Sequence, residues 1–204
     1  TNSVFLLKFL EMKKIQMVDL QSQYQKIKNE VDEKVLNVMQ SAQFINGSEV
    51  HNFQKELEQY LGVKHVIPCA NGTDALQIAL MALDLQPGDE VITADFTFAA
   101  TVEVVHLLKL KSVLVDVDYD TFNIDIEKLK AAITPKTKAI IPVHLFGQCA
   151  NMEAVLEVAK EHNLYVIEDN CQGIGADYTF SDGTVKKSGT MGTIGTTSFF
   201  PSKD

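Results

Sequence analysis

The sequence has little positive charge and no long apolar run. Its 18 Lys and Arg residues are outnumbered by 27 Asp and Glu residues, which gives a net charge of −9 and a pI near 5.0. Nucleic-acid binders carry basic patches, so this composition argues against nucleic acid as a partner. The early apolar cluster at residues 4–10 is interrupted by Lys8. It is too short to span a membrane and lacks the cleavage site of a signal peptide, so we expect no membrane partner.

Cysteine is also scarce. Cys69, Cys149 and Cys171 are odd in number and widely spaced, which fits neither a disulfide framework nor a zinc site. We therefore expect a cytoplasmic protein without a metal, in which each cysteine is a small buried apolar residue.

The length of 204 residues and the 46% apolar content predict one domain with one sizeable core. Residues 1–11 differ in character from the rest of the chain, and Met12 begins a cleaner segment. We interpret residues 1–11 as an N-terminal extension, and residues 12–204 as N-terminal helices followed by a larger folded part.

The rest of the chain alternates between two periodicities. Apolar residues at helical spacing predict a helix around residues 27–39, and a second helix should follow Ser48 as N-cap and end near Leu61. The predicted strands are 65–69, 91–94, 113–117, 139–143 and 164–167, and the helices between and around them are 74–83, 99–109, 126–132 and 152–162. This order predicts an α/β fold with a largely parallel sheet covered by helices on both faces. Ligands bind such sheets at the carboxyl ends of the strands.

Two segments at those ends could bind an anionic cofactor. Gly72 and Thr73 form a small-residue turn that leads into a helix, where free N–H groups and the helix dipole suit a phosphate. An ordinary turn capped by Thr73 or Asp74 is the alternative. Phe98 could lie on a planar heteroaromatic ring, or it could belong to the core.

Two further segments carry groups for catalysis. Glu168 and Asp169 are adjacent carboxylates where a predicted strand ends, and a helix cap or a solvated loop is the alternative. Ser198 and Lys203 place a hydroxyl and an amine near another strand end, although an isolated lysine is normally a surface residue. The glycines between 173 and 195 lack the G-x-G-x-x-G spacing, so we set a nicotinamide dinucleotide aside.

Taken in order, the segments NGTDAL, DFTFAAT, PVHLFGQ, EDNCQ and SFFPSK resemble the DegT/DnrJ/StrS-type family of nucleotide-sugar aminotransferases, which use pyridoxal 5'-phosphate (PLP). The resemblance runs from Met12 to the end and implies the large domain of a fold-type-I PLP-dependent transferase. FINGSEV, CANGTDALQIAL and LFGQCA are most similar to the branch that aminates UDP-linked 2-acetamido-3-keto-hexuronates.

The resemblance also implies roles for individual residues. Lys203 matches the catalytic lysine that forms a Schiff base with PLP, and Asp169 matches the carboxylate that pairs with the pyridine nitrogen. The remaining cofactor contacts implied are a phosphate site, a stacked ring and a neighbour of the phenolic oxygen, at Gly72, Thr73, Ser198, Phe98 and Gln172. His144 lies in a family motif without an assigned role.

The implied reaction moves an amino group from an amino acid, glutamate by resemblance, to a nucleotide-linked keto sugar. The resemblance further implies a homodimer with Phe44–Val50 near the cofactor, and a small C-terminal domain beyond Asp204, so we expect an incomplete enzyme. A PLP-dependent sugar dehydratase is the first alternative, but dehydratases in this family replace the lysine with histidine, and Lys203 argues against that. A non-catalytic regulator with the same fold is the second.

Overall fold

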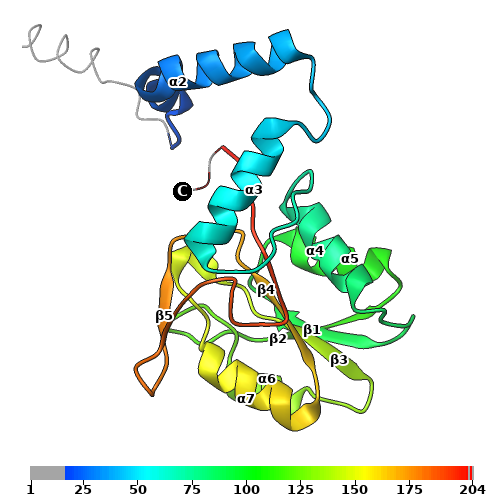
Figure 1. Cartoon of the computed structure of the whole chain (residues 1–204). Helices are drawn as coiled ribbons and strands as arrows, with labels where there is room; N and C mark the ends of the chain where they lie inside the picture. The colour runs from blue at the N-terminus through cyan, green and yellow to red at the C-terminus, as the bar shows by residue number, and fades with distance from the viewer. Residues whose placement is uncertain (1–16, 202, 204) are drawn as a thin grey trace, which may run out of the picture. The chain divides into compact units, whose positions relative to one another are not determined.

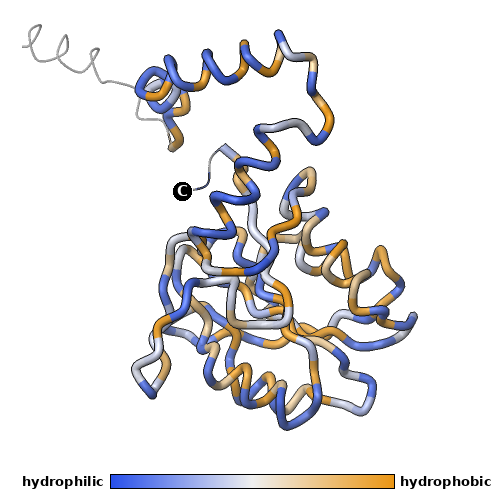
Figure 2. The backbone as a smooth tube through the Cα atoms, viewed as in Figure 1, coloured by the Kyte–Doolittle hydropathy of each residue, from blue (hydrophilic) through white to orange (hydrophobic). Residues whose placement is uncertain are grey.

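The computed structural model describes residues 17–201 and 203, which form two compact units divided after Gly47. The predicted extension at residues 1–11 lies outside the described residues. In the first unit, α2 runs over Leu20–Ser41 and is capped by the Asp19 side chain, which accepts a hydrogen bond from the Ser22 N–H. Figure 2 shows hydrophilic and hydrophobic residues alternating along α2, none of which is buried.

The second unit contains a parallel sheet of five strands in the order β2-β1-β3-β4-β7. The strands are β1 Glu90–Ala94, β2 Lys111–Val115, β3 Thr137–Ile141, β4 Tyr165–Asp169 and β7 Ile194–Thr196. Because all five run the same way, their carboxyl ends meet at one edge of the sheet.

Helices cover both faces of this sheet (Figure 1). The helices of the second unit are α3 Ser48–Leu61, α4 Gly72–Ala82, α5 Ala99–Leu107, α6 Ile126–Ala131 and α7 Met152–His162. Val91 packs with α4 and α5, whereas its neighbour Ile92 packs with α6 and α7, because successive side chains of a strand point to opposite faces. The predicted covered, largely parallel sheet is confirmed.

One predicted strand is wrong. Residues 65–69 form no strand, and Ile67 is 79% exposed. The segment is apolar, but a strand needs a hydrogen-bonding neighbour, and none of the described strands pairs with it. The Val66 N–H donates instead to the Glu58 side chain. Two other predicted strands, 113–117 and 139–143, begin two residues earlier, at Lys111 and Thr137.

A small antiparallel hairpin between β4 and β7 was not predicted from the sequence. It consists of β5 Asp177–Thr179 and β6 Val185–Lys187, joined through Gly183, whose φ of +85° favours glycine. The Tyr178 hydroxyl donates to the Asn151 side chain at the start of α7. Among residues 17–201 and 203, no helix has the length and apolarity needed to cross a membrane.

Candidate active site

Three segments that are distant in sequence meet at the first residue of α4. A Cβ atom built on Gly72 would lie 2.7 Å from Cys171 Sγ and 2.8 Å from Ser198 Cβ. Cys171 follows β4 and Ser198 follows β7, so only a residue without a side chain lets the helix start lie this close to both loops. The predicted neighbours Gly72 and Ser198 are therefore brought together.

The start of α4 presents backbone N–H groups that no carbonyl of the helix can accept. Its N-cap is Asn71, whose side chain accepts a hydrogen bond of 2.9 Å from the Asp74 N–H. The alternative cap, Thr73 or Asp74, is therefore wrong. The N–H groups of Gly72 and Thr73 lie in the first helical turn, where no intrahelical acceptor exists. Together with the Ser198 hydroxyl, they form a cradle of the kind that binds phosphate.

Asp169 is the last residue of β4, and its carboxylate is buried. Its Oδ2 accepts a hydrogen bond of 2.8 Å from the Thr101 hydroxyl, and its Oδ1 accepts one of 3.2 Å from the Cys171 N–H. A carboxylate oxygen can accept two hydrogen bonds, so both oxygens keep capacity for a cationic partner. The predicted strand ended at residue 167, but the carboxylates lie within the strand, so the solvated loop and the helix cap are both wrong.

Glu168 faces the other side of the strand and is used differently. Its fully buried carboxylate accepts hydrogen bonds from three backbone N–H groups and from His144. Of the two adjacent carboxylates, only Asp169 has acceptor capacity left for a ligand.

Two further predicted residues lie at the same edge of the sheet. Phe98 is the N-cap of α5 and is 69% exposed, so its ring is available for stacking and the core alternative is wrong. Gln172 lies in the loop after β4, and its Oε1 accepts a hydrogen bond of 3.1 Å from the Phe146 N–H. This bond joins the loop after β3 to the loop after β4.

Lys203 is half-buried, and its N–H donates to the Phe200 carbonyl oxygen at 2.8 Å. Its ammonium acts on the thiol of Cys171. Burial raises the pKa of Cys171 well above its usual range, the nearby Asp169 carboxylate raises it further, and the positive charge of Lys203 opposes both effects. The amine and the carboxylate that the sequence singled out therefore act on the same thiol.

The cysteines depart from expectation in one case. Cys69 is exposed, whereas Cys149 and Cys171 are partly buried. Cys69 belongs to the segment predicted as a buried strand, so both errors have one cause. Burial raises the pKa of Cys149 to about 11, with smaller contributions from the charges of Glu168 and Asp177. Within the described residues, no cluster of three or more His, Cys, Asp or Glu side chains could hold a metal ion.

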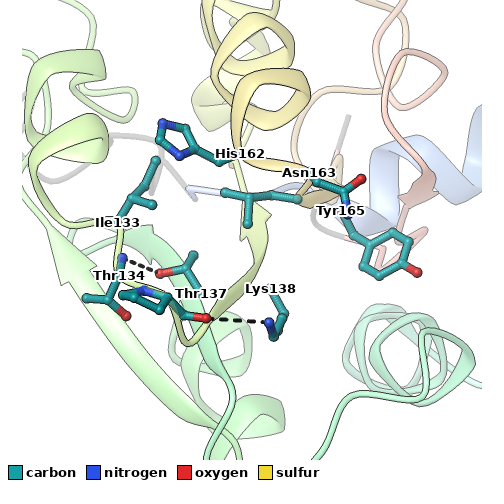
Figure 3. A pocket seen from close by; sticks show the side chains of 9 residues that line it. Ile133, Thr134, Thr137, Lys138, His162, Asn163 and Tyr165 are labelled. Atoms are coloured by element: carbon teal, nitrogen blue, oxygen red, sulfur yellow. Dashed lines mark hydrogen bonds between the residues drawn. The ribbon is translucent and has the colours of Figure 1, made fainter.

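A cavity of about 640 Å³ lies at the opposite edge of the sheet, where β3 and β4 begin (Figure 3). Its lining includes Thr134, Thr137, Lys138, His162 and Tyr165. None of the predicted site residues lines it. The Thr134 N–H donates to the Thr137 hydroxyl at 2.9 Å, so the polar groups of this cavity are partly paired with one another.

Two residues of the site, Thr101 and Asn71, were not predicted from the sequence. Thr101 lies in the DFTFAAT segment three residues after Phe98, which places it in the first turn of α5, and a hydroxyl there could have been recognised as a partner for a carboxylate. Asn71 precedes the predicted helix at the position that N-cap residues prefer.

Residues 25–204 match the sequence profile of the DegT/DnrJ/EryC1/StrS aminotransferase family. The chain is 48% identical to UDP-2-acetamido-2-deoxy-3-oxo-D-glucuronate aminotransferase of Pseudomonas aeruginosa, over 93% of this chain and 51% of the relative. It is also 48% identical to a pleiotropic regulatory protein of Geobacillus stearothermophilus, over 93% and 50% of the two chains. It therefore spans about half the length of these curated relatives.

Solved structures agree with this assignment. A DegT DnrJ EryC1 StrS aminotransferase from Brucella abortus superposes with a TM-score of 0.87 at 42% identity, over 93% of this chain and 52% of the other. NtdA from Bacillus subtilis, solved with bound cofactor PMP, gives a TM-score of 0.74 at 38% identity, over 81% and 38%. The chain belongs to the DegT/DnrJ/EryC1/StrS aminotransferase family.

Proposed function

We propose that this protein is a PLP-dependent aminotransferase that moves an amino group from glutamate to the keto group of a nucleotide-linked sugar, in particular a UDP-2-acetamido-3-oxo-hexuronate. The observation that carries the proposal is that Gly72 and Ser198 lie against Cys171 at the edge of the sheet where the buried carboxylate of Asp169 also ends its strand. The charge of Lys203 acts on the same cysteine, which supports Lys203 as the amine of this site. The relative from Pseudomonas aeruginosa, named for this substrate, supports the sugar assignment.

The residues at this edge fit PLP. The N–H groups of Gly72 and Thr73 and the hydroxyl of Ser198 would hold the phosphate, and the exposed ring of Phe98 would lie on the pyridine ring. Bound PLP supplies an electron sink for the carbanion formed at the amino acid's α-carbon. The bound PMP of the Bacillus subtilis neighbour, the aminated form of PLP, supports this cofactor.

Asp169 and Lys203 divide the chemistry between them. The buried carboxylate of Asp169 would pair with the pyridine nitrogen, and its negative charge keeps that nitrogen protonated. Gln172 would contact the phenolic oxygen. The amine of Lys203 would attach the cofactor covalently, and when free it would take the proton from the α-carbon of the amino donor.

The proposal extends to assembly and location. We propose a homodimer in which Phe44–Val50 lies near the cofactor, and the 22-residue helix α2, which buries none of its residues, supports docking against a second copy. Free Cys69, Cys149 and Cys171 support a reducing cytoplasm as the place of action. Nucleotide-sugar amination there would serve polysaccharide synthesis.

A regulator without turnover is the second candidate, because a relative at 48% identity is named a pleiotropic regulatory protein. One experiment separates the two. The protein is incubated with PLP, reduced with borohydride, digested and examined by mass spectrometry. The enzyme predicts the cofactor mass on Lys203 and an absorbance change on adding glutamate. A protein without an adduct would favour the regulator, and an adduct on Lys186 or Lys187 would overturn the assignment of Lys203.

A further inference from the structure

Next to the candidate site lies a buried pair to which the proposed chemistry gives no task. The side chains of His144 and Glu168 are both fully buried, and His144 Nε2 lies 2.8 Å from Glu168 Oε2. A buried ionisable pair is costly unless all its polar atoms are satisfied. The hydrogen bonds around this pair satisfy its polar atoms and join several distant parts of the chain.

Four donors surround the Glu168 carboxylate. Oε2 accepts from the Gly189 N–H at 2.8 Å and from His144, and Oε1 accepts from the N–H groups of Met191 and Gly192, both at 2.6 Å. Two oxygens with two donors each leave no room for a proton on the acid, so Glu168 is an anion held by charge-assisted hydrogen bonds.

The partner of His144 on its other side fixes its tautomer. The Ala150 N–H lies 3.1 Å from His144 Nδ1. A backbone N–H can only donate, so Nδ1 is the acceptor and the ring proton is on Nε2, which donates to Glu168. His144 is therefore a neutral bridge between the loop after β3 and the carboxylate.

The same two residues hold the backbone around Asp169 and β7. The His144 N–H donates to the Asp169 carbonyl oxygen at 3.0 Å, and the Thr196 hydroxyl donates to the Glu168 carbonyl oxygen at 3.1 Å. Residues 189–192, three of whose N–H groups donate to the Glu168 side chain, lead into β7, and Thr196 ends it. Glu168 thus holds both ends of the strand that leads to Ser198 and Lys203.

We infer that His144 and Glu168 are positioning residues of the cofactor site. They fix the place of Asp169, on β4, relative to the segment after β7 that carries Ser198 and Lys203. This inference rests on the proposed function, because the distance that the pair would set is the one between the carboxylate that pairs with the pyridine nitrogen and the lysine amine. Both side chains are fully buried and their polar atoms are already paired, so neither is proposed to contact the cofactor. A shift of about 1 Å between reacting groups can cost about 100-fold in rate, so a small loosening of this pair has a measurable effect.

Two substitutions of His144 separate its two hydrogen bonds. In His144→Gln the side-chain amide can reach the Nε2 position and keep a donor for Glu168. In His144→Asn the amide oxygen takes the Nδ1 position, which keeps the acceptor for Ala150 and removes the donor to Glu168. His162→Asn, at an exposed histidine of the opposite sheet edge, is the matched control.

The readouts use the PLP-loaded protein. For His144→Asn we expect single-turnover amino transfer from glutamate to slow by about 10- to 100-fold, with the PLP dissociation constant changed by less than about threefold because the phosphate cradle is intact. The pH at which the absorbance of the bound cofactor changes should also shift. His144→Gln should remain close to wild type in both readouts. A purely structural role would lower the melting temperature without moving the absorbance profile.

Thr196→Val provides an independent variant if His144→Asn does not fold. It has nearly the same shape and removes only the hydroxyl that donates to the Glu168 carbonyl oxygen, and it should shift the absorbance profile in the same direction. A wild-type protein that does not take up PLP would overturn the proposed function and this inference with it. Normal uptake by wild type, with an unchanged profile in every folded variant, would overturn the inference alone.

Discussion

The two edges of the same sheet differ in how they treat polar groups. The amino edge holds the 640 Å³ cavity, and its buried carboxylate, Glu90, pairs with the exposed amine of Lys111. At the carboxyl edge, both partners of each bond are buried, as in the bonds from Thr101 to Asp169 and from His144 to Glu168. The proposed chemistry therefore lies at the edge where paired polar side chains are buried, and not at the edge that holds the cavity.

The largest effect on this contrast is expected from removing the amine of Lys203. Lys203→Ala removes the only group proposed to bind PLP covalently, so turnover should be abolished, while PLP should still bind through Gly72, Ser198 and Asp169. Mass spectrometry after borohydride reduction should find no adduct, and equilibrium dialysis should still find bound PLP. Lys186→Ala, in the exposed hairpin, is the control and should behave as wild type. Retained turnover in Lys203→Ala would show that the amine at the carboxyl edge does not carry out the reaction.

Gly72→Ala tests the cradle. The added methyl would lie 2.7 Å from Cys171 Sγ and 2.8 Å from Ser198 Cβ, so the start of α4 must move away from the loop. Overpacking of this kind costs about 1–3 kcal/mol, which corresponds to about a 5- to 150-fold loss of affinity if the cost falls on the bound geometry. Calorimetry with PLP, and with inorganic phosphate alone, measures this loss. Ala99→Ser, at the exposed start of α5, is the control. Equal affinity in Gly72→Ala would show that the phosphate binds elsewhere.

Asp169→Asn sharpens the contrast between binding and catalysis at the carboxyl edge. It keeps the shape and a hydrogen-bonding side chain but removes the charge that is proposed to keep the ring nitrogen protonated. A shift of one pKa unit is worth about 1.4 kcal/mol, so proton removal from the amino donor should slow by about tenfold or more. PLP should remain attached to Lys203. Near-wild-type single-turnover rates with glutamate would contradict the ring-nitrogen role of Asp169.

The smallest effect is expected at the amino edge. The ion pair with Lys111 and the hydrogen bond from Thr134 hold the pKa of Glu90 below its usual 4.5. A lowered folded-state pKa contributes stability above the unfolded value, and this contribution is lost as the pH falls from about 4.5 through the folded value. Urea unfolding should therefore show a smaller stability loss between pH 6 and 3 in Glu90→Gln than in wild type. PLP affinity should not change, and a parallel loss of affinity would show that the two edges are coupled.

Local periodicity explains what the sequence could predict. The helix predicted over 152–162 is α7, residue for residue, because Met152, Val155 and Ala159 repeat at helical spacing and Asn151 caps it. Pairing between distant segments explains the failures. Residues 65–69 have strand composition without a paired neighbour, and the hairpin of β5 and β6 depends on contacts with α7.

The same distinction between local pattern and long-range contact applies to the candidate site. The rule that ligands bind at carboxyl ends of parallel strands selected Glu168 and Asp169 together, and the resemblance supplied Lys203 and the choice of Asp169. The strand-end rule alone could not tell Glu168 from Asp169, because the difference depends on which face each side chain takes and on the turn at residues 189–192. His144 had no role for the same reason, since its two partners, Glu168 and Ala150, lie 24 and 6 residues away.

The turn at residues 189–192 has no regular secondary structure, yet three of its N–H groups end on a fully buried carboxylate. Deuterium can replace these protons only when their hydrogen bonds to the Glu168 carboxylate break, and that opening also releases the start of β7. In the timing of hydrogen exchange this stretch therefore belongs with the central strands rather than with the loops, so irregular backbone in this protein does not imply a mobile segment.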